Sequence, residues 1–425
     1  MDTPPRLAVD RLLDDRETRI IVCCGAGGVG KTTTAAALGV RAAGRGRKAV
    51  VLTIDPARRL AQSMGIDSLD NTPRKVETVG AGDGELHAMM LDMKRTFDEI
   101  VEAHADGERA RAILANPFYQ SLSAGFAGTQ EYMAMEKLGQ LRAQDDWDLI
   151  IVDTPPSRSA LDFLDAPKRL GSFLDGKFIR VLMAPAKVGG RAGMKFLNVG
   201  MSMMTGTLSK LMGASLLKDV QTFVAAMDTM FGGFRTRADA TFRLLQAPGT
   251  AFLVVAAPEP DALREAAYFV ERLAADRMPL AGLVLNRVHG SGADQLSAER
   301  ALAAAENLEE GGIVDQESGK AGLRDSGSEP TEPAETTRTA NPPETGSPGA
   351  EGDTAVVDRI TAGLLRLHAE RMQVIARERR TRDRFTSLHP EVAVAEVTAL
   401  PGDVHDLAGL RAIGERLAAG VPAGA

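Results

Sequence analysis

RIIVCC (Arg19–Cys24), GAGGVGKT (Gly25–Thr32) and an alanine-rich segment over residues 33–46 follow one another without a break. The first run is typical of a buried strand, the glycines of a tight turn and the alanines of a helix. A second apolar run, Lys48–Ile54 (KAVVLTI), comes directly after the helix and ends at Asp55. This order predicts a βαβ unit with the glycine turn at the carboxyl end of its first strand.

The rest of the chain continues this alternation. We expect further parallel strands at four short apolar runs, Leu149–Val152, Ala251–Val255, Ala281–Leu285 and Val392–Val397, and helices at patterns such as Asp261–Leu273 and Asp353–Arg380. Strands that alternate with helices predict an α/β fold with a doubly wound, mostly parallel sheet. Ligands of such sheets bind at the carboxyl ends of strands, where Asp55, Asp153 and Asn286 fall.

The glycine turn has the pattern G-x-x-x-x-G-K-[ST], which ends in Lys31 and Thr32. Glycines let successive backbone N–H groups converge on phosphate oxygens, and the helix N-terminus adds positive potential. Lys31 offers a charge to the β- and γ-phosphates, and the Thr32 hydroxyl is a ligand for Mg²⁺. The pattern predicts a sheet of the P-loop NTPase type, with nucleotide bound at Gly25, Ala26, Gly27, Gly28, Val29, Gly30, Lys31, Thr32 and Thr33.

Two aspartates follow predicted strands. Asp153 ends the run DLIIVD, the position from which a carboxylate can hold Mg²⁺ through water. Asp55 ends the neighbouring run and precedes Pro56. Its carboxylate could orient and deprotonate an attacking water, although an aspartate that closes a strand is also a common turn residue. Both interpretations of Asp55 stay open at this point.

Five segments resemble the family of the arsenite-pump ATPase (ArsA), which includes the eukaryotic targeting ATPase for tail-anchored membrane proteins: GGVGKTTT, TIDPARRL, VDTPPSRSALDFL, APEPDALREAAYFVERL and GLVLNRV. Their order matches over most of residues 19–300, and the chain is similar to actinobacterial members with a single loop. The resemblance implies ATP and Mg²⁺ as cofactors, Lys31 and Asp55 as catalytic residues, and Asp153 at the start of the second switch. It also implies that Glu259 and Asn286 touch the nucleotide, with Asn286 reading the adenine; alternatively, Asn286 caps its strand.

Two positions depart from the family pattern. Relatives commonly carry GKGGVGKT, whose early lysine crosses a dimer interface to the partner's nucleotide, and here that position is Ala26. A homodimer would therefore lack both crossing charges, whereas a lysine-bearing paralogue in a heterodimer could supply one. A slow homodimer and a monomeric switch are the alternatives. Ser159 stands where the family's DTAPTGHT run has its histidine, so the relay out of the second switch differs.

The chain has two cysteines, the adjacent Cys23 and Cys24. Neighbouring cysteines do not easily form a disulfide, and in a core strand they behave as small apolar side chains. The thiolates of the pump's arsenite site and the CxxC pair of the eukaryotic relatives' zinc site therefore have no counterpart in this sequence.

Residues 165–248 are predicted to form a helical insertion rich in methionine. Eight of the 17 methionines lie between Met183 and Met230. In the targeting relatives, the corresponding region forms an apolar groove for a client's membrane helix, and flexible methionine side chains suit such a surface. A client groove, an interface with a paralogue and a plain helical core are three open interpretations.

Residues 307–353 hold eleven acidic and three basic side chains, a charge of −8, so the rest of the chain carries +1. This segment is rich in Pro, Gly, Ser and Thr and has few bulky apolar residues, which predicts a disordered insertion. The chain divides accordingly into a first part of the core (1–164), the helical insertion (165–248), a second core part (249–306), the acidic insertion (307–353) and a C-terminal core part (354–425).

The net charge of −7 argues against nucleic-acid binding through a basic surface. Acidic residues interrupt the basic cluster Arg377–Arg384, which is typical of a solvated helix end. The N-terminus has acids where a signal peptide needs a basic start, and no run of 18 uncharged apolar residues occurs. We therefore expect a cytoplasmic protein, and we expect the C-terminal leucine stripe over 407–417 to pack on the sheet.

Together these features predict a Mg²⁺-dependent ATPase of the ArsA family, in which hydrolysis drives a conformational switch in a dimer. Two alternatives remain. One is an ATP-regulated targeting or holding factor for hydrophobic segments, and the other is the energising subunit of a membrane anion transporter.

Overall fold

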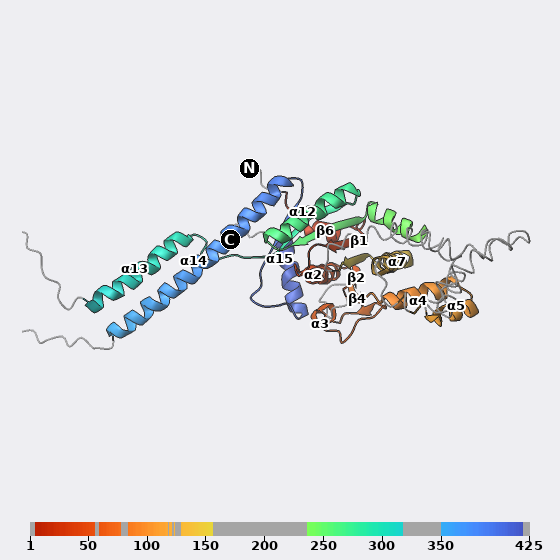
Figure 1. Cartoon of the computed structure of the whole chain (residues 1–425), viewed down its shortest axis with the longest axis horizontal. Helices are drawn as coiled ribbons and strands as arrows, with labels where there is room; N and C mark the ends of the chain where they lie inside the picture. Colours follow the sequence, from red (N-terminus) through yellow and green to blue (C-terminus); the bar gives the residue numbers. More distant parts are fainter. Residues whose placement is uncertain are drawn as a thin grey trace, which may run out of the picture. The chain divides into compact units, whose positions relative to one another are not determined.

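The computed structural model describes residues 5–55, 59–77, 84–117, 119–120, 123, 129–155, 236–317 and 350–419 (Figure 1). They belong to two units. One lies within Met1–Val288 and Thr381–Ala423, and the other within His289–Arg380. The predicted helical insertion lies outside the described residues up to residue 235, as do Ser159 and residues 318–349 of the acidic segment.

The first unit contains an eight-stranded sheet in the order β3-β4-β2-β5-β1-β6-β7-β8. Its strands are β1 (Ile20–Cys24), β2 (Lys48–Thr53), β3 (Arg74–Lys75), β4 (Glu85–Met90), β5 (Leu149–Asp153), β6 (Thr250–Ala256), β7 (Leu280–Val288) and β8 (Val394–Thr398). Every neighbouring pair is parallel except β3 and β4. The predicted doubly wound, mostly parallel sheet is confirmed.

Helices cover both faces of the sheet, which is why its central strands are continuously apolar. Ile20, Val22 and Cys24 of β1 join one core cluster, and Ile21 and Cys23 join the other. The first cluster includes residues of α4 (Met93–His104), α7 (Thr129–Gln144) and α12 (Pro260–Ala275); the second includes α2 (Lys31–Gly44) and α15 (Leu407–Ala419). Both cysteines are buried in β1, as predicted.

The four strands predicted beyond β2 are confirmed, with ends that shift by at most three residues. Strand β4 was missed, because ELHAMM mixes a charge and a histidine with apolar residues. It pairs with β2, and its burial alternates over most of its length. Leu410, Ile413 and Leu417 of α15 are buried in the second cluster, which confirms the expected packing of the C-terminal stripe. The first unit also contains α1 (Val9–Asp14), α3 (Arg59–Ser63) and α5 (Gly107–Leu114).

The second unit consists mainly of α13 (Ala298–Glu317) and the part of α14 (Ala350–Leu388) that runs up to Arg380. The predicted helix Asp353–Arg380 is therefore longer at both ends. The acidic segment 307–353 begins inside α13 and ends inside α14, so helix overlaps the predicted disordered insertion at both of its edges.

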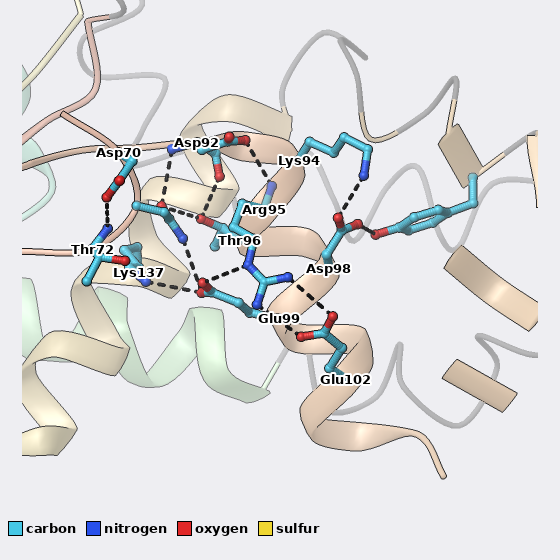
Figure 2. A network of polar contacts seen from close by, with 12 residues as sticks. Asp70, Thr72, Asp92, Lys94, Arg95, Thr96, Asp98, Glu99, Glu102 and Lys137 are labelled. Atoms are coloured by element: carbon cyan, nitrogen blue, oxygen red, sulfur yellow. Dashed lines mark hydrogen bonds and ion pairs between the residues drawn. The ribbon is translucent and has the colours of Figure 1, made fainter. Parts of the chain in front are cut away.

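A polar network joins α4 to α7 (Figure 2). Asn71 Oδ1 accepts hydrogen bonds from the Asp92 N–H and the Thr96 hydroxyl, each at 3.1 Å. Asn71 Nδ2 donates to Glu99 Oε2 at 3.1 Å, and Lys137 Nζ of α7 donates to the same oxygen at 3.1 Å. Since α7 leads directly into β5, the network holds the helix that precedes Asp153.

Replacement of Glu99 by alanine should destabilise the first unit by about 2 kcal/mol, because it leaves the Lys137 ammonium, which is 8% exposed, and the Asn71 amide without their acceptor. Glu102→Ala is the matched control: Glu102 pairs with Arg95 at the surface, where such pairs contribute less than about 1 kcal/mol. The comparison is made by thermal unfolding, and equal midpoints for the two variants would contradict this role.

Candidate nucleotide site

The glycine turn connects β1 to α2 at the carboxyl edge of the sheet. A Cβ on Gly25, whose φ is +147°, would lie 2.1 Å from the carbonyl oxygen of Val255 in β6. Gly30, the N-cap of α2, has φ +96°, and a Cβ there would lie 2.2 Å from Asn286 Nδ2. Neither position can hold a side chain, so the turn exposes backbone rather than side chains to the space beyond the sheet edge.

Asn286 lies in β7, and its side chain is directed to the turn: Nδ2 donates to the Val29 carbonyl at 2.9 Å. The residue is 6% exposed. Strand β7 runs to Val288, so Asn286 lies two residues before its end, and its side chain bonds the glycine turn rather than capping its own strand. The contact shows a role that the sequence did not suggest, since it ties β7 to the glycine turn, and contact with adenine stays a prediction.

Lys31 begins α2, and its side chain folds back over the turn to donate from Nζ to the Ala26 carbonyl at 2.8 Å. Burial lowers the pKa of Lys31, and the charges of Asp153 and Asp55 oppose that effect. An ammonium group inside a ring of backbone groups is the arrangement that a phosphate chain requires.

Asp153 ends β5 and has no exposed surface. Its Oδ2 accepts from the Thr32 hydroxyl at 2.7 Å and from the Thr53 hydroxyl at 2.8 Å. Its Oδ1 is buried and has no hydrogen-bond partner among the described residues. Burial raises the pKa of Asp153 to about 6, and the two hydroxyl donors and the charge of Lys31 partly counteract this shift.

Thr53 and Thr154 were not recognised as site residues. Thr53 ends β2, and besides bonding Asp153 it accepts the Asp55 N–H at 3.2 Å. The Thr154 hydroxyl donates to the Cys23 carbonyl at 2.9 Å, which joins the residue after Asp153 to β1. The available signal for both was a threonine within two residues of an aspartate that follows an apolar run.

Asp55 lies two residues beyond β2 and is partly buried. Its charge adds to the raised pKa of Asp153 and opposes the burial that lowers the pKa of Lys31. Glu259 is an exposed residue at the N-cap of α12, and its side chain makes no cap hydrogen bond. The structure thus brings Lys31, Thr32 and Asp153 together with Asp55 within electrostatic reach, whereas Glu259 stands at the surface.

A glycine turn between the central parallel strand and a helix, with a buried lysine and aspartate beside it, defines a P-loop nucleotide-binding protein. The family model described as anion-transporting ATPase (ArsA) matches residues 18–309. The chain therefore belongs to the anion-transporting ATPase family. Membership makes it an ATPase, and the glycine turn stays its predicted nucleotide site.

Known proteins agree with this assignment. The chain is 30% identical over 167 residues to the ATPase GET3 of Malassezia globosa, a match that covers 39% of this chain and 47% of that protein. It is 26% identical over 298 residues to the ATPase GET3 of Podospora anserina, which covers 68% of this chain and 80% of the relative. A Mycobacterium tuberculosis protein, Rv2184c, is 31% identical over 168 residues, 37% of this chain and 40% of the relative.

Among the described helices, none is both long and apolar enough to cross a membrane.

Asp153 should make the stability of the nucleotide-free protein depend on pH. The unfolded carboxyl titrates near 3.8 and the folded one at about 6, so the buried anion costs nothing below about pH 4 and up to about 3 kcal/mol above pH 6. Asp153→Asn should therefore raise the unfolding midpoint at pH 8, and its advantage should vanish as the pH falls towards 4. Denaturant unfolding with chelator present measures this, and a difference that is constant from pH 4 to 8 would contradict it.

Proposed function

We propose that this chain is a Mg²⁺-dependent ATPase whose hydrolysis cycle switches the segment that follows Asp153. The observation that carries the proposal is the meeting of Lys31, Thr32 and a buried Asp153 at the edge of the glycine turn. A charge for phosphate and oxygen ligands for a hard divalent cation are supplied there together.

The residues fit Mg²⁺ bound with ATP. Thr32 offers a hydroxyl that now donates to Asp153, and the free lone pairs of Asp153 Oδ1 could accept from a metal-bound water. When bound, the ion would neutralise charge that develops on the phosphates. Thr53 would hold the Asp153 carboxylate in place whether or not Thr32 turns towards the metal.

Asp55 is the proposed general base. It follows β2 at the carboxyl edge, and Thr53 anchors its N–H. From this position the carboxylate would orient a water for in-line attack on the γ-phosphate and accept its proton, while Lys31 would stabilise charge on the phosphate oxygens.

The proposed switch starts at Asp153. Thr154 bonds the Cys23 carbonyl through both its backbone N–H and its hydroxyl, at 3.3 and 2.9 Å. A change in how Asp153 is held would therefore reach residues 154–165 and, through them, open or close the 165–248 region. A γ-phosphate that orders loops and releases them after hydrolysis is a general way to obtain such a switch.

Two substitutions separate binding from chemistry. Lys31→Ala should lose both tight ATP binding and turnover, because it removes the phosphate-binding charge, whereas Asp55→Asn should keep ATP binding and lose about 100-fold or more in kcat. Asp261→Asn, at an exposed position of α12, is the control. Steady-state hydrolysis with Mg²⁺ and equilibrium binding of ATP are measured together; an Asp55→Asn enzyme of normal rate would refute the assignment.

We also propose that the active assembly is a dimer. Because Ala26 carries no charge at the position of the crossing lysine, the proposed partner is a paralogue that has this lysine. Ala26 lies on the turn, and its carbonyl accepts from Lys31. A second lysine ammonium at the nucleotide site, besides that of Lys31, would therefore come from a partner chain. A slow homodimer and a monomeric switch are the competing states.

Ala26→Lys tests the partner hypothesis. In a homodimer it would restore one crossing charge at each site, and we expect turnover to rise at least about tenfold together with ATP-dependent dimerisation. Sedimentation and hydrolysis are measured on the same samples. A wild-type chain that already dimerises with ATP and turns over as fast as the variant would show that no lysine-bearing partner is needed.

The methionine content of residues 165–248 supports a second candidate function, an ATP-regulated holding or targeting factor for hydrophobic segments. The family description, anion-transporting ATPase, suggests a third, an energising subunit of a transporter. Binding of an isolated apolar helix that depends on the nucleotide state would favour the former, and stimulation of hydrolysis by an oxyanion would favour the latter.

A further inference from the structure

Helix α14 carries a row of exposed apolar side chains. Val356, Val357, Ile360, Leu364 and Leu367 are 53–63% exposed, and we call them the α14 stripe. Large aliphatic side chains that are exposed singly are ordinary, but a contiguous row on one helix indicates a surface that is covered in the working protein.

The α14 stripe does not belong to the contact with α13. Ala362 and Ala369 on α14 and Ala301 and Ala305 on α13 have no exposed surface. The two helices are joined by an ion pair between Arg366 and Glu309, and His368 donates to the carbonyl of Leu296 in the turn before α13; the helices lie side by side in Figure 1. The small residues form the closed face of this pair, and the stripe lies on another side of α14.

The spacing of the stripe is that of a coiled-coil seam. Val357, Ile360, Leu364 and Leu367 are separated by three, four and three residues, as in positions a and d of a heptad. The four positions are also symmetric about residue 362. In an antiparallel pair of identical helices, position 357 therefore meets 367 of the other copy, and 360 meets 364.

Charge favours the same antiparallel arrangement. Residues 350–362 carry three acids and one base, a net −2, and residues 363–380 carry five bases and two acids, a net +3. A parallel pair would bring halves of like net charge together, whereas an antiparallel pair brings each half against the half of opposite net charge.

We propose that the α14 stripe is the docking site for a second copy of this chain, bound antiparallel so that two α13–α14 pairs form a four-helix assembly. This contact is separate from the nucleotide site, so it should form without ATP or Mg²⁺. Five side chains cover less area than the roughly 800 Å² that each partner buries in a standard interface. We therefore expect a reversible dimer.

Sedimentation of the full chain without nucleotide tests the contact. The wild type should approach twice its 45.1 kDa as concentration rises, and Ile360→Glu with Leu364→Glu should weaken association at least about tenfold. The matched control adds the same charge at exposed positions away from the stripe, Ala355→Glu with Gln373→Glu, and should associate like the wild type. A monomeric wild type, or equal association of both variants, would overturn the proposal.

Two further results distinguish other occupants and orientations. If another segment of the same chain covers the stripe, Ile360→Glu with Leu364→Glu lowers the thermal midpoint of the monomer, and the proposal is wrong. Cysteine pairing tests the orientation: a mixture of Val357→Cys and Leu367→Cys chains should form a disulfide dimer, and neither variant should do so alone. Dimers of Val357→Cys alone would instead indicate parallel pairing. Cys23 and Cys24 are buried and do not interfere.

Discussion

The fully buried carboxylate of Asp153 is the group on which the arrangement of the nucleotide site depends. A buried anion is tolerated only when donors or cations surround it. Here the donors are the hydroxyls of Thr32 and Thr53, and the charge of Lys31 lies within reach. These residues come from the start of α2 and the ends of β2 and β5, so the strand order β2-β5-β1 is what makes the site possible.

The glycine turn is shaped from the other side of β1. The carbonyl of Val255 in β6 lies so close to Gly25 that no Cβ fits there, and Asn286 of β7 donates a hydrogen bond to the Val29 carbonyl. The two halves of the chain therefore meet at the turn: one supplies its backbone and the other supports it. The α13–α14 pair belongs to the second unit and has its own closed face and its own exposed apolar stripe.

Most of the fold was predictable because its strands are short, apolar and bounded by clear turns. Continuous burial on both faces makes runs such as LIIVD conspicuous. Strand β4 was not predicted, because it lies further out in the sheet and some of its side chains are only partly buried. The ends of α13 and α14 were not predicted because both helices extend into the segment whose acidic, glycine-containing composition indicated disorder.

The sequence by itself determined the glycine turn and made Lys31, Thr32 and Asp153 the candidate residues for phosphate and Mg²⁺, because such binding restricts residue type at fixed spacing. It could not show that Thr53 holds Asp153, that Asn286 supports Val29, or that Arg47 is buried with its guanidinium bonded to backbone carbonyls. These contacts join residues far apart in the chain. Only the strand order and register, which no local pattern encodes, bring such atoms within hydrogen-bond distance.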